Sequence, residues 1–387
     1  MNVVLVTVDA WRADFVDGLV PCLDSVADRT VRFERMYANG PWTTPPLISA
    51  FTGESVARHR VWFEWSVPRP DSPGLVKTLR AAGFHAPNLC YLNRLGMYAN
   101  LGYDARDAPD PPHDAEDETL VRAIRETPSP FFLWFHYKFV HLPYWHPERY
   151  RRAAGVDDDA IPRRLRDSVC TGFVVPKDEH PLRPEDRETV RRLYASGVLR
   201  MNDWLAGVLD AIRARADTSL VLTSDHGEEL LDHGHVGHAS TAHHAHLYEE
   251  VLRIPLFVVD PRAKRRGIRW RVQSLDLFPT ILSLAGVAAP PSAGWDLFPI
   301  VLGAMPPSDD RFFYFHAARM GCPTPRELEG HYVEAASTGS YKILRERYDT
   351  ERVALYDLAN DPAEQTPVDD PYLLAKLREL LARLATQ

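Results

Sequence analysis

The chain has 387 residues, of which 45% are hydrophobic and 25% are charged, an ordinary composition for a globular protein. Its 45 Lys and Arg against 53 Asp and Glu give a net charge of -8. This balance argues against nucleic acid or an anionic membrane as a partner, because either would need a basic face. At roughly 150 residues per domain, the length predicts two or three domains, or one large α/β domain with a smaller appendage.

The cysteines and the first residues bear on the compartment. Four scattered cysteines form no CxxC pair and no metal-finger spacing, which predicts free thiols in a reducing environment. The first apolar run ends after six residues at Asp9, and no stretch approaches the roughly 18 uncharged apolar residues of a membrane span. We therefore expect a cytoplasmic protein without a signal peptide or a membrane anchor.

Four short apolar runs, rich in β-branched and aromatic residues, predict strands buried on both faces of a sheet. They cover residues 3–8, 130–136, 218–223 and 254–259. Helical patterns lie between them over residues 73–82, 187–215 and 275–285. Strands that alternate with helices predict an α/β fold with helices on both faces of the sheet.

Two segments break this alternation. Residues 145–186 are charged, contain prolines and lack sustained periodicity, which predicts an excursion from the sheet that is partly loop and is a candidate cap for an active site. From about residue 305 the pattern changes to short strands and a final helix over 371–385. We expect a catalytic α/β domain over 1–304 and a small C-terminal α+β subdomain over 305–387.

Carboxylates and histidines follow the predicted strands. Asp9 follows the first strand, His136 and His141 the second, and Asp225 with His226 the third. Parallel sheets place ligands at the carboxyl ends of their strands. An Asp at a strand end is by itself more often a helix N-cap. Together, however, hard oxygen donors and imidazoles at one edge predict a divalent metal site.

Histidines are also concentrated in one segment. Seven of the sixteen histidines lie between His226 and His246, in the run SDHGEELLDHGHVGHASTAHHAH. This density favours metal or anion chemistry over a merely solvated surface. One ion cannot bind all seven, so we expect two or three to act directly and the others to support them, face the substrate or lie exposed.

A candidate nucleophile lies in the segment NGPWTTPPLISAFTG, residues 39–53. Pro is tolerated in the first turn of a helix, so Thr43 or Thr44 is predicted at a helix N-terminus, where free N–H groups favour an anion. An adjacent metal can activate a hydroxyl at such a position. The simpler interpretation of either residue is a plain Thr N-cap.

Six landmarks, in their chain order, resemble the sulfatase family of the alkaline phosphatase superfamily. They are VTVDAWRADF, PWTTPPLISAFTG, HYKFVHLPY, TSDHGEELLDHGHVGH with LYEEVLRIPLFV, SLDLFPTILSLAGV, and YKILRE with ALYDLANDPAEQ. The resemblance implies an alkaline-phosphatase-like three-layer α/β sandwich with a mixed, largely parallel sheet, a small C-terminal subdomain and a metal-dependent ester hydrolase site. The run WRADF is similar to the phosphonate monoester hydrolase and phosphodiesterase branch.

The resemblance also implies a metal site. Asp9 matches the first metal carboxylate of the family, and Asp225 with His226 matches its Asp-His or Asp-Asn metal pair. Thr43 stands two residues before Pro45, where the family signature Cys-x-Pro-Ser-Arg or Ser-x-Pro-Ser-Arg has its nucleophile. We therefore expect Asp9, Asp225, His226 and the Thr43 hydroxyl to hold one divalent ion, with Thr43 as the nucleophile.

Further histidines are implied on the substrate side. His141 matches the His of the HxPY segment, which contacts the transferred group or the leaving oxygen, and we expect it to be a cation together with His238. His238 stands where relatives carry a Lys or His that binds the anionic group. We also place His136 and His243 on the substrate side. The run ASTAHHAH leaves the register open, so His243 is the reserve for His238, and which of His238, His243, His244 and His246 faces the substrate is not settled by the sequence.

Three departures from the family pattern bear on the chemistry. Sulfatases oxidise the signature Cys or Ser to formylglycine, whereas Thr43 cannot give the same aldehyde, so no formylglycine is expected. Pro46 and Leu47 replace the Ser-Arg of the signature, and Ala10 stands where relatives often have Asp or Gln. Thr nucleophiles occur in phosphodiesterase members, so these departures favour phosphoryl over sulfuryl transfer.

These observations predict a metal-dependent hydrolase of small anionic phosphate, phosphonate or sulfate esters. Mn or Zn is favoured over Ca, because imidazole is a poor ligand for Ca. One alternative is a transferase in which another acceptor takes the group from Thr43. Another is a pseudo-enzyme that binds an anionic ligand, which Ala10 favours and the retained Asp9 and Asp225 oppose. A homo-oligomer is left open.

Overall fold

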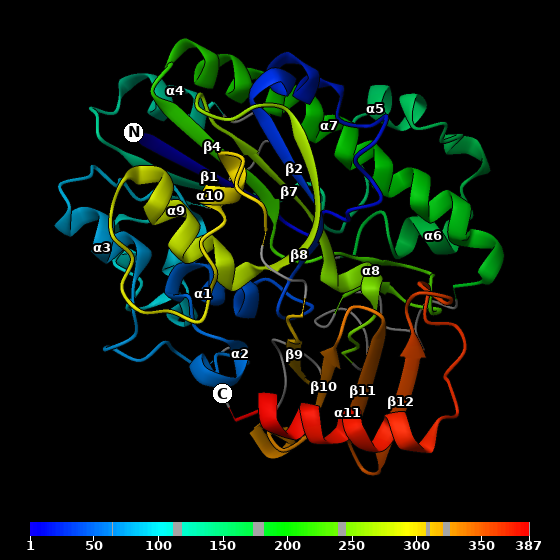
Figure 1. Cartoon of the computed structure of the whole chain (residues 1–387). Helices are drawn as coiled ribbons and strands as arrows, with labels where there is room; N and C mark the ends of the chain where they lie inside the picture. Colours follow the sequence, from blue (N-terminus) through cyan, green and yellow to red (C-terminus); the bar gives the residue numbers. More distant parts are fainter. Residues whose placement is uncertain are drawn as a thin grey trace.

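A six-stranded mixed sheet forms the centre of the larger part of the molecule (Figure 1). The structure is a computed structural model and describes residues 1–63, 65–110, 118–172, 182–238, 245–306, 310–319 and 326–386. The strand order is β3-β1-β4-β7-β2-β8. The strands are β1 (Asn2–Val8), β2 (Thr30–Tyr37), β3 (Phe132–Tyr137), β4 (Thr218–Ser224), β7 (Arg253–Val259) and β8 (Arg266–Gln273). Strand β7 is antiparallel to both of its neighbours, and the other pairs are parallel.

The register of β1 brings two acidic residues together. Val8 pairs with Tyr137 of β3 on one side and with Ser224 of β4 on the other. Asp9 and Asp225 are the next residues of their strands, so they leave the sheet side by side at its carboxyl edge. All seven residues of β1 are buried, which explains its continuous apolar run.

Helices cover both faces of this sheet (Figure 1). Alternate residues of β1 belong to different apolar cores, with Val3 and Leu5 in one and Val4 and Val6 in the other. The first core includes residues of α1 (Thr44–Thr52), α3 (Leu75–Ala81) and α9 (Leu277–Ala285). The second includes residues of α4 (Thr119–Glu126) and the long α7 (Arg187–Ala214). The arrangement is therefore a three-layer sandwich.

A second sheet forms the C-terminal subdomain. Its antiparallel strands have the order β12-β11-β10-β9 and cover β9 (Phe313–Ala318), β10 (Tyr332–Ser337), β11 (Tyr341–Arg347) and β12 (Glu351–Asp357). Helix α11 (Pro371–Leu384) packs across one face of this sheet (Figure 1). Its residues Leu377, Leu380 and Leu381 are buried against apolar side chains of the strands.

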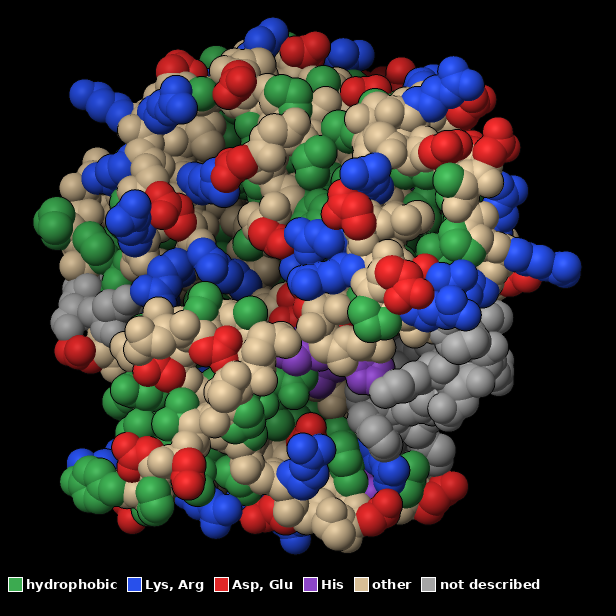
Figure 2. Space-filling model, turned by 90° about the vertical axis from the view of Figure 1, so that its right-hand side faces the viewer, with side chains coloured by type: hydrophobic (Ala, Val, Ile, Leu, Met, Phe, Trp, Pro, Cys, Tyr) green, Lys and Arg blue, Asp and Glu red, His purple; other side chains and the backbone are tan. Residues whose placement is uncertain are grey.

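Short elements complete the described chain. The short helices and the hairpin strands are α2 (Val56–His59), α5 (Glu148–Ala153), α6 (Arg163–Asp167), α8 (Glu249–Leu252), α10 (Phe298–Val301), β5 (Glu229–Leu230) and β6 (Val236–Gly237). The 3-10 helices are η1 (Pro21–Arg29), η2 (Tyr91–Arg94), η3 (Gly96–Tyr98), η4 (Ala105–Asp107), η5 (Asp158–Ala160), η6 (Pro184–Asp186), η7 (Ser274–Asp276) and η8 (Arg326–Leu328). Figure 2 shows acidic and basic side chains interspersed over one face, with histidines reaching the surface between them.

The predicted fold class is confirmed, including the mixed sheet and the C-terminal subdomain. All four predicted strands form, within two residues of their expected limits. Strands β2 and β8 were not predicted, because Arg and Glu interrupt their apolar pattern. In the excursion over 145–186, α5 packs against α7, and residues 173–181 lie outside the described residues. The boundary between 304 and 305 stays a prediction. No helix among the described residues is long and apolar enough to cross a bilayer.

Three buried histidines make this fold sensitive to acid. Burial, aided by nearby positive charge, lowers the pKa of His59, His146 and His316 to about 3. In the unfolded chain these histidines become protonated as the pH falls below 6.5, their ordinary pKa. In the folded chain they stay neutral until the pH approaches about 3. Their contribution to stability is therefore intact above the unfolded pKa and is lost as the pH falls.

As the pH drops below about 6, we expect the free energy of unfolding to decrease by up to about 4 kcal/mol per pH unit. Each of the three histidines contributes about 1.4 kcal/mol per pH unit. His316→Phe preserves an aromatic ring stacked on Trp62, where the centroids lie 3.8 Å apart. This variant should lose about one third of the slope. Urea unfolding across this pH range measures the slope, and exposed His85→Gln should keep the wild-type value. An unchanged slope in His316→Phe would contradict the assignment.

Candidate active site

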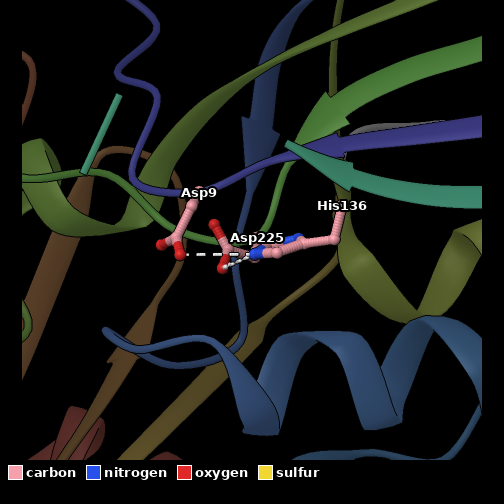
Figure 3. A group of neighbouring side chains, drawn as sticks. All are labelled: Asp9, His136 and Asp225. Carbon is pink, nitrogen blue, oxygen red and sulfur yellow. Dashed lines mark ion pairs between the residues drawn. The ribbon is translucent and has the colours of Figure 1, made fainter. Parts of the chain in front are cut away.

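Four buried polar side chains converge at the carboxyl ends of β1, β3 and β4, and Figure 3 shows three of them. The Nε2 atom of His136 lies 3.3 Å from Asp9 Oδ2 and 3.9 Å from Asp225 Oδ2. The Nε2 atom of His226 lies 3.5 Å from Asp9 Oδ1 and 3.5 Å from Asp225 Oδ2. One ligand atom each from Asp9, His136 and Asp225 lie within 4.8 Å of one another. The expected meeting of Asp9, Asp225 and His226 is therefore observed.

The hydrogen bonds around this group leave one atom of each side chain unpaired. Asp9 Oδ1, Asp225 Oδ2 and the Nε2 atoms of His136 and His226 are buried and have no hydrogen-bond partner in the described part of the chain. Such a group ordinarily costs about 1–3 kcal/mol to bury. Two carboxylate oxygens and two imidazole nitrogens around one point form a donor set that suits a divalent ion. The residues present therefore fit a metal ion.

Neighbouring backbone and hydroxyl groups orient these donors. The Nδ1 atom of His226 donates to the carbonyl of Gly227 at 2.7 Å, which turns its Nε2 atom toward the carboxylates and leaves that atom for an ion. Asp225 Oδ1 accepts from the backbone N–H groups of Ala10 at 3.1 Å and His226 at 2.8 Å, which leaves Oδ2 for the ion. The Nδ1 atom of His136 lies 2.9 Å from Thr7 Oγ1.

His136 occupies a different place from the expected one. We expected it on the substrate side, but the structure places its Nε2 atom beside both carboxylates (Figure 3). The reason is its position within β3, where it is the last residue but one and the register pairs it with Thr7 of β1 near the carboxyl edge of the sheet. Ala10 offers no side-chain donor where relatives often have Asp or Gln. His136 supplies a donor to the same group from the neighbouring strand.

The charges in this group stabilise one another. Burial alone would raise the pKa of Asp9, but His141, His136 and His226 outweigh it and hold the pKa well below its usual value. Burial likewise opposes the charged form of His226, and the charges of Asp225 and Asp9 nevertheless raise its pKa to about 9. Asp9 is therefore ionised throughout the physiological pH range, as a metal ligand must be.

The two threonines at the start of α1 differ in their surroundings. Thr44 is buried, and its hydroxyl lies 3.1 Å from both Tyr98 Oη and Met97 Sδ. The charges of Asp225 and Asp9 add to burial in raising the pKa of Tyr98, which places the start of α1 near the carboxylates. Thr43 precedes this helix and is half-buried. Its role as nucleophile stays a prediction.

Three histidine rings lead outward from the metal donors. The ring of His238 lies 4.2 Å from that of His226 and 4.8 Å from that of His141, centroid to centroid. The Nδ1 atom of His141, which is half-buried, donates to the carbonyl of Leu142 at 2.7 Å. His141 and His238 thus lie together beside the donors, and their roles toward the substrate stay predictions. His243 and His244 lie outside the described residues.

His238 has a partner that sequence reasoning missed. Its Nδ1 atom lies 2.9 Å from Oε1 of the fully buried Glu228, whose Oε2 accepts from the Tyr144 hydroxyl at 2.9 Å. Burial first, and the neighbouring His226 second, lower the pKa of His238, although Glu228 opposes the shift. The ring therefore favours its neutral form, contrary to the expected imidazolium. The run SDHGE contained the signal for Glu228, a carboxylate two residues after His226.

Lys138 is a second residue that sequence reasoning missed. It is half-buried, and its Nζ atom lies 5.7 Å from the ring centroid of Tyr91 and 5.4 Å from that of Phe139. Burial lowers the pKa of Lys138, and the charge of Asp9 opposes this shift, so the two groups are within electrostatic reach. A cation therefore stands at the edge of the donor group, one residue beyond β3.

Comparisons with known proteins identify the family. A family model described as Sulfatase matches residues 1–287, and one described as N-sulphoglucosamine sulphohydrolase, C-terminal, matches residues 238–387. The chain belongs to the sulfatase family. The predicted family is therefore confirmed.

Solved structures and sequence relatives agree with this membership. The fold is similar to the phosphonate monoester hydrolase of Agrobacterium radiobacter, with a TM-score of 0.79 and 20% identity over 100% of this chain and 95% of that chain. It is also similar to the structure of a 2-O GAG sulfatase, with a TM-score of 0.76 and 19% identity. That match covers 100% of this chain and 92% of the other chain. The Uncharacterized sulfatase YidJ of Escherichia coli is 22% identical over 328 residues, which cover 69% of this chain. The chain spans 63% of the length of YidJ.

Proposed function

We propose that this protein is a metal-dependent hydrolase of small anionic esters, and that it prefers phosphate or phosphonate esters to sulfate esters. The observation that carries the proposal is the convergence of four unpaired donors from Asp9, His136, Asp225 and His226. When bound there, a divalent ion, with Mn or Zn favoured by the two imidazoles, supplies positive charge that acidifies a nearby hydroxyl and neutralises an anionic ester.

Thr43 is the proposed nucleophile. Its oxygen forms a bond to phosphorus as the bond from phosphorus to the leaving oxygen breaks, and the hydroxyl proton passes to a neighbouring base or to solvent. Water then attacks phosphorus, which releases phosphate and restores the Thr43 hydroxyl. Thr44 is less suited to this role, because its hydroxyl already contacts Tyr98 and Met97.

His141 is the proposed proton donor to the leaving oxygen. It is half-buried at the outer end of the three histidine rings, and its Nδ1 proton is fixed on the Leu142 carbonyl. The Nε2 atom therefore delivers or receives the moving proton. Lys138 supplies the fixed positive charge for the substrate that Leu47, in place of the signature Arg, does not supply.

The preference for phosphorus rests on the nucleophile. A threonine side chain cannot be converted to the aldehyde that sulfatases use, so we expect neither formylglycine nor its hydrate at Thr43. A phosphothreonine is an ordinary phosphate monoester that water cleaves by attack at phosphorus, which needs no special residue chemistry. A transferase would differ only in the acceptor that replaces water.

A substrate panel tests this proposal. The full chain is reconstituted separately with Mn²⁺, Zn²⁺ and Ca²⁺ and assayed on aryl phosphate monoesters, phosphate diesters, phosphonates and sulfates. We expect the wild-type protein to turn over a phosphorus ester and Asp225→Asn to show no turnover of it. Added alcohols or amines that capture the group in place of water would identify a transferase. A metal-loaded protein that turns over none of these substrates would favour the pseudo-enzyme and overturn the proposal.

The leaving-group series tests His141. We expect His141→Ala to lower kcat/KM by about 10²-fold or more for esters with poorly acidic leaving groups, and by much less for 4-nitrophenol, because only the former need a proton in the transition state. The measurement is the slope of log kcat/KM against leaving-group pKa. His85→Gln, at an exposed position, should keep the wild-type slope. Equal loss with every leaving group would remove His141 from this role.

A further inference from the structure

A second group of carboxylates and histidines lies beyond Glu228. One ligand atom each from Glu229, His233 and Glu250 lie within 4.8 Å of one another. The Nε2 atom of His246 lies 3.0 Å from Glu229 Oε2. These side chains come from β5, from the turn that follows it, from α8 and from the residues before α8. None of them belongs to the candidate active site, so the group calls for a separate explanation.

Buried polar atoms of Glu229 and His246 lack the hydrogen bonds that buried polar atoms ordinarily make. His246 is 7% exposed, and neither of its ring nitrogens makes a hydrogen bond within the described chain. The Oε2 atom of the fully buried Glu229 is also unpaired there, although Oε1 accepts from the backbone N–H groups of His233 and His235. The His246 Nε2 and Glu229 Oε2 atoms form an ion pair at 3.0 Å and are close enough for both to bind one metal ion.

His233 and Glu250 complete the group from the other side. The His233 Nδ1 atom lies 2.7 Å from Glu250 Oε1, and the ring stacks on Tyr248 with the centroids 3.7 Å apart. The Nε2 atom of His233 lies 3.3 Å from the carbonyl of Glu364. Stacking on Tyr248 and contacts at both nitrogens thus fix the ring, and a positioned imidazole is what a metal ligand requires.

A pocket gives access to this group. It has a volume of about 740 Å³ and is lined by Glu250 together with Asp232, Arg187, Arg253 and Gln365. Gln365 lies 3.2 Å from the His233 Nε2 atom, so the pocket reaches the edge of the group. The lining carries both acidic and basic side chains, and a small ion can approach Glu250 through this pocket.

We propose that Glu229, His233, Glu250 and His246 hold a second divalent cation, distinct from the one at the candidate active site. Once the two imidazoles have given up their protons, the four side chains carry a charge of -2, which a divalent ion neutralises. Two nitrogens and two oxygens suit Zn²⁺ or Mn²⁺ better than Mg²⁺ or Ca²⁺, which prefer oxygen donors alone. Binding displaces the protons that the imidazoles carry, as it does at other histidine sites.

The position of this ion indicates its role. Glu229 begins β5, whereas His233 contacts Glu364 in the segment that follows β12 of the C-terminal subdomain. The ion would therefore join the β5–β6 hairpin to α8 and the residues before it, and its ligand His233 also contacts the C-terminal segment. We assign it a structural role, because its ligands leave the reacting groups at Asp9 and Thr43 untouched.

Metal content separates the two sites. The full chain is dialysed against Zn²⁺, or against Mn²⁺ in a parallel series, and bound metal per chain is measured by mass spectrometry of the elements. We expect two equivalents in the wild type and one in the double variant Glu229→Gln/His246→Gln. His235→Gln, in the same turn, should keep two equivalents. One equivalent in the wild type, or two in the double variant, would overturn the proposal.

A second variant keeps the test decisive if the double variant fails to fold. Asp225→Asn removes a donor only from the candidate active site, so it should bind one Zn²⁺ in a calorimetric titration and show a raised Tm with Zn²⁺. Adding Glu229→Gln should abolish that binding. An Asp225→Asn protein that folds but binds no Zn²⁺ would exclude the second site. Zn²⁺ binding by Asp225→Asn, combined with no turnover by the metal-loaded wild type, would contradict the proposed function alone.

Discussion

Thr43→Ala is expected to lower kcat by about 10³-fold or more on the best phosphorus ester, because it removes the atom that forms the covalent bond. Thr44→Val should cost far less in kcat, since the Thr44 hydroxyl packs against Tyr98 and Met97 rather than facing the reaction. Steady-state kinetics of the two variants provides a matched comparison, because the residues are adjacent and of the same type. Wild-type activity in Thr43→Ala would reject the nucleophile assignment.

The covalent adduct itself can be observed. An acid quench during turnover should trap a phosphoryl group on the peptide that carries Thr43, identified by its mass. Thr43→Ser should still form the adduct, because serine retains the hydroxyl. Detection of an aldehyde in that peptide would instead overturn the expectation that no formylglycine forms.

Asp9→Ala is expected to remove the ion from the candidate active site and to abolish turnover. Asp9 contributes one of only two carboxylates among the four donors, and its removal takes from His136 its nearest carboxylate and from His226 one of two equally near carboxylates. Metal content should fall by one equivalent, whereas exposed Asp24→Asn should leave it unchanged. An Asp9→Ala protein with full metal content would show that these donors do not hold the ion.

His136→Ala distinguishes a metal ligand from a substrate-binding residue. A ligand role predicts a metal affinity weakened by about 10-fold or more, with activity that excess metal partly restores. A substrate role predicts a raised KM at unchanged metal affinity. Calorimetric titration with Zn²⁺ alongside steady-state kinetics separates the two outcomes.

The sequence predicted which residues lie at the carboxyl edge of the sheet better than it predicted where each side chain points. Asp9 and Asp225 were predictable because each follows a strongly apolar strand, and parallel neighbours end at the same edge. His136 was predicted on the substrate side, whereas its Nε2 atom lies beside Asp9 and Asp225, because the residue lies within β3 rather than after it. Which face of the sheet a strand residue points to depends on a register that the pattern of one strand does not contain.

The histidine-rich run shows a second limit. Its density predicted metal chemistry, but His238 belongs with the active-site donors whereas His233 and His246 lie with Glu229. This division depends on the hairpin of β5 and β6, whose strands are two residues long and give no periodic signal. Lys138 and Glu228 were missed for a related reason, since their roles arise from contacts between distant segments.

The β5–β6 hairpin also directs successive side chains of this part of the chain to opposite sides. Glu228 contacts His238 and Tyr144, while the very next residue, Glu229, contacts His246. Consecutive residues of an extended chain point in opposite directions, so the backbone here assigns odd and even positions to different neighbourhoods. A one-residue insertion before Glu228 would exchange these assignments and disrupt both groups at once. A two-residue insertion would let each side chain face its original side again and would change only its position along the strand.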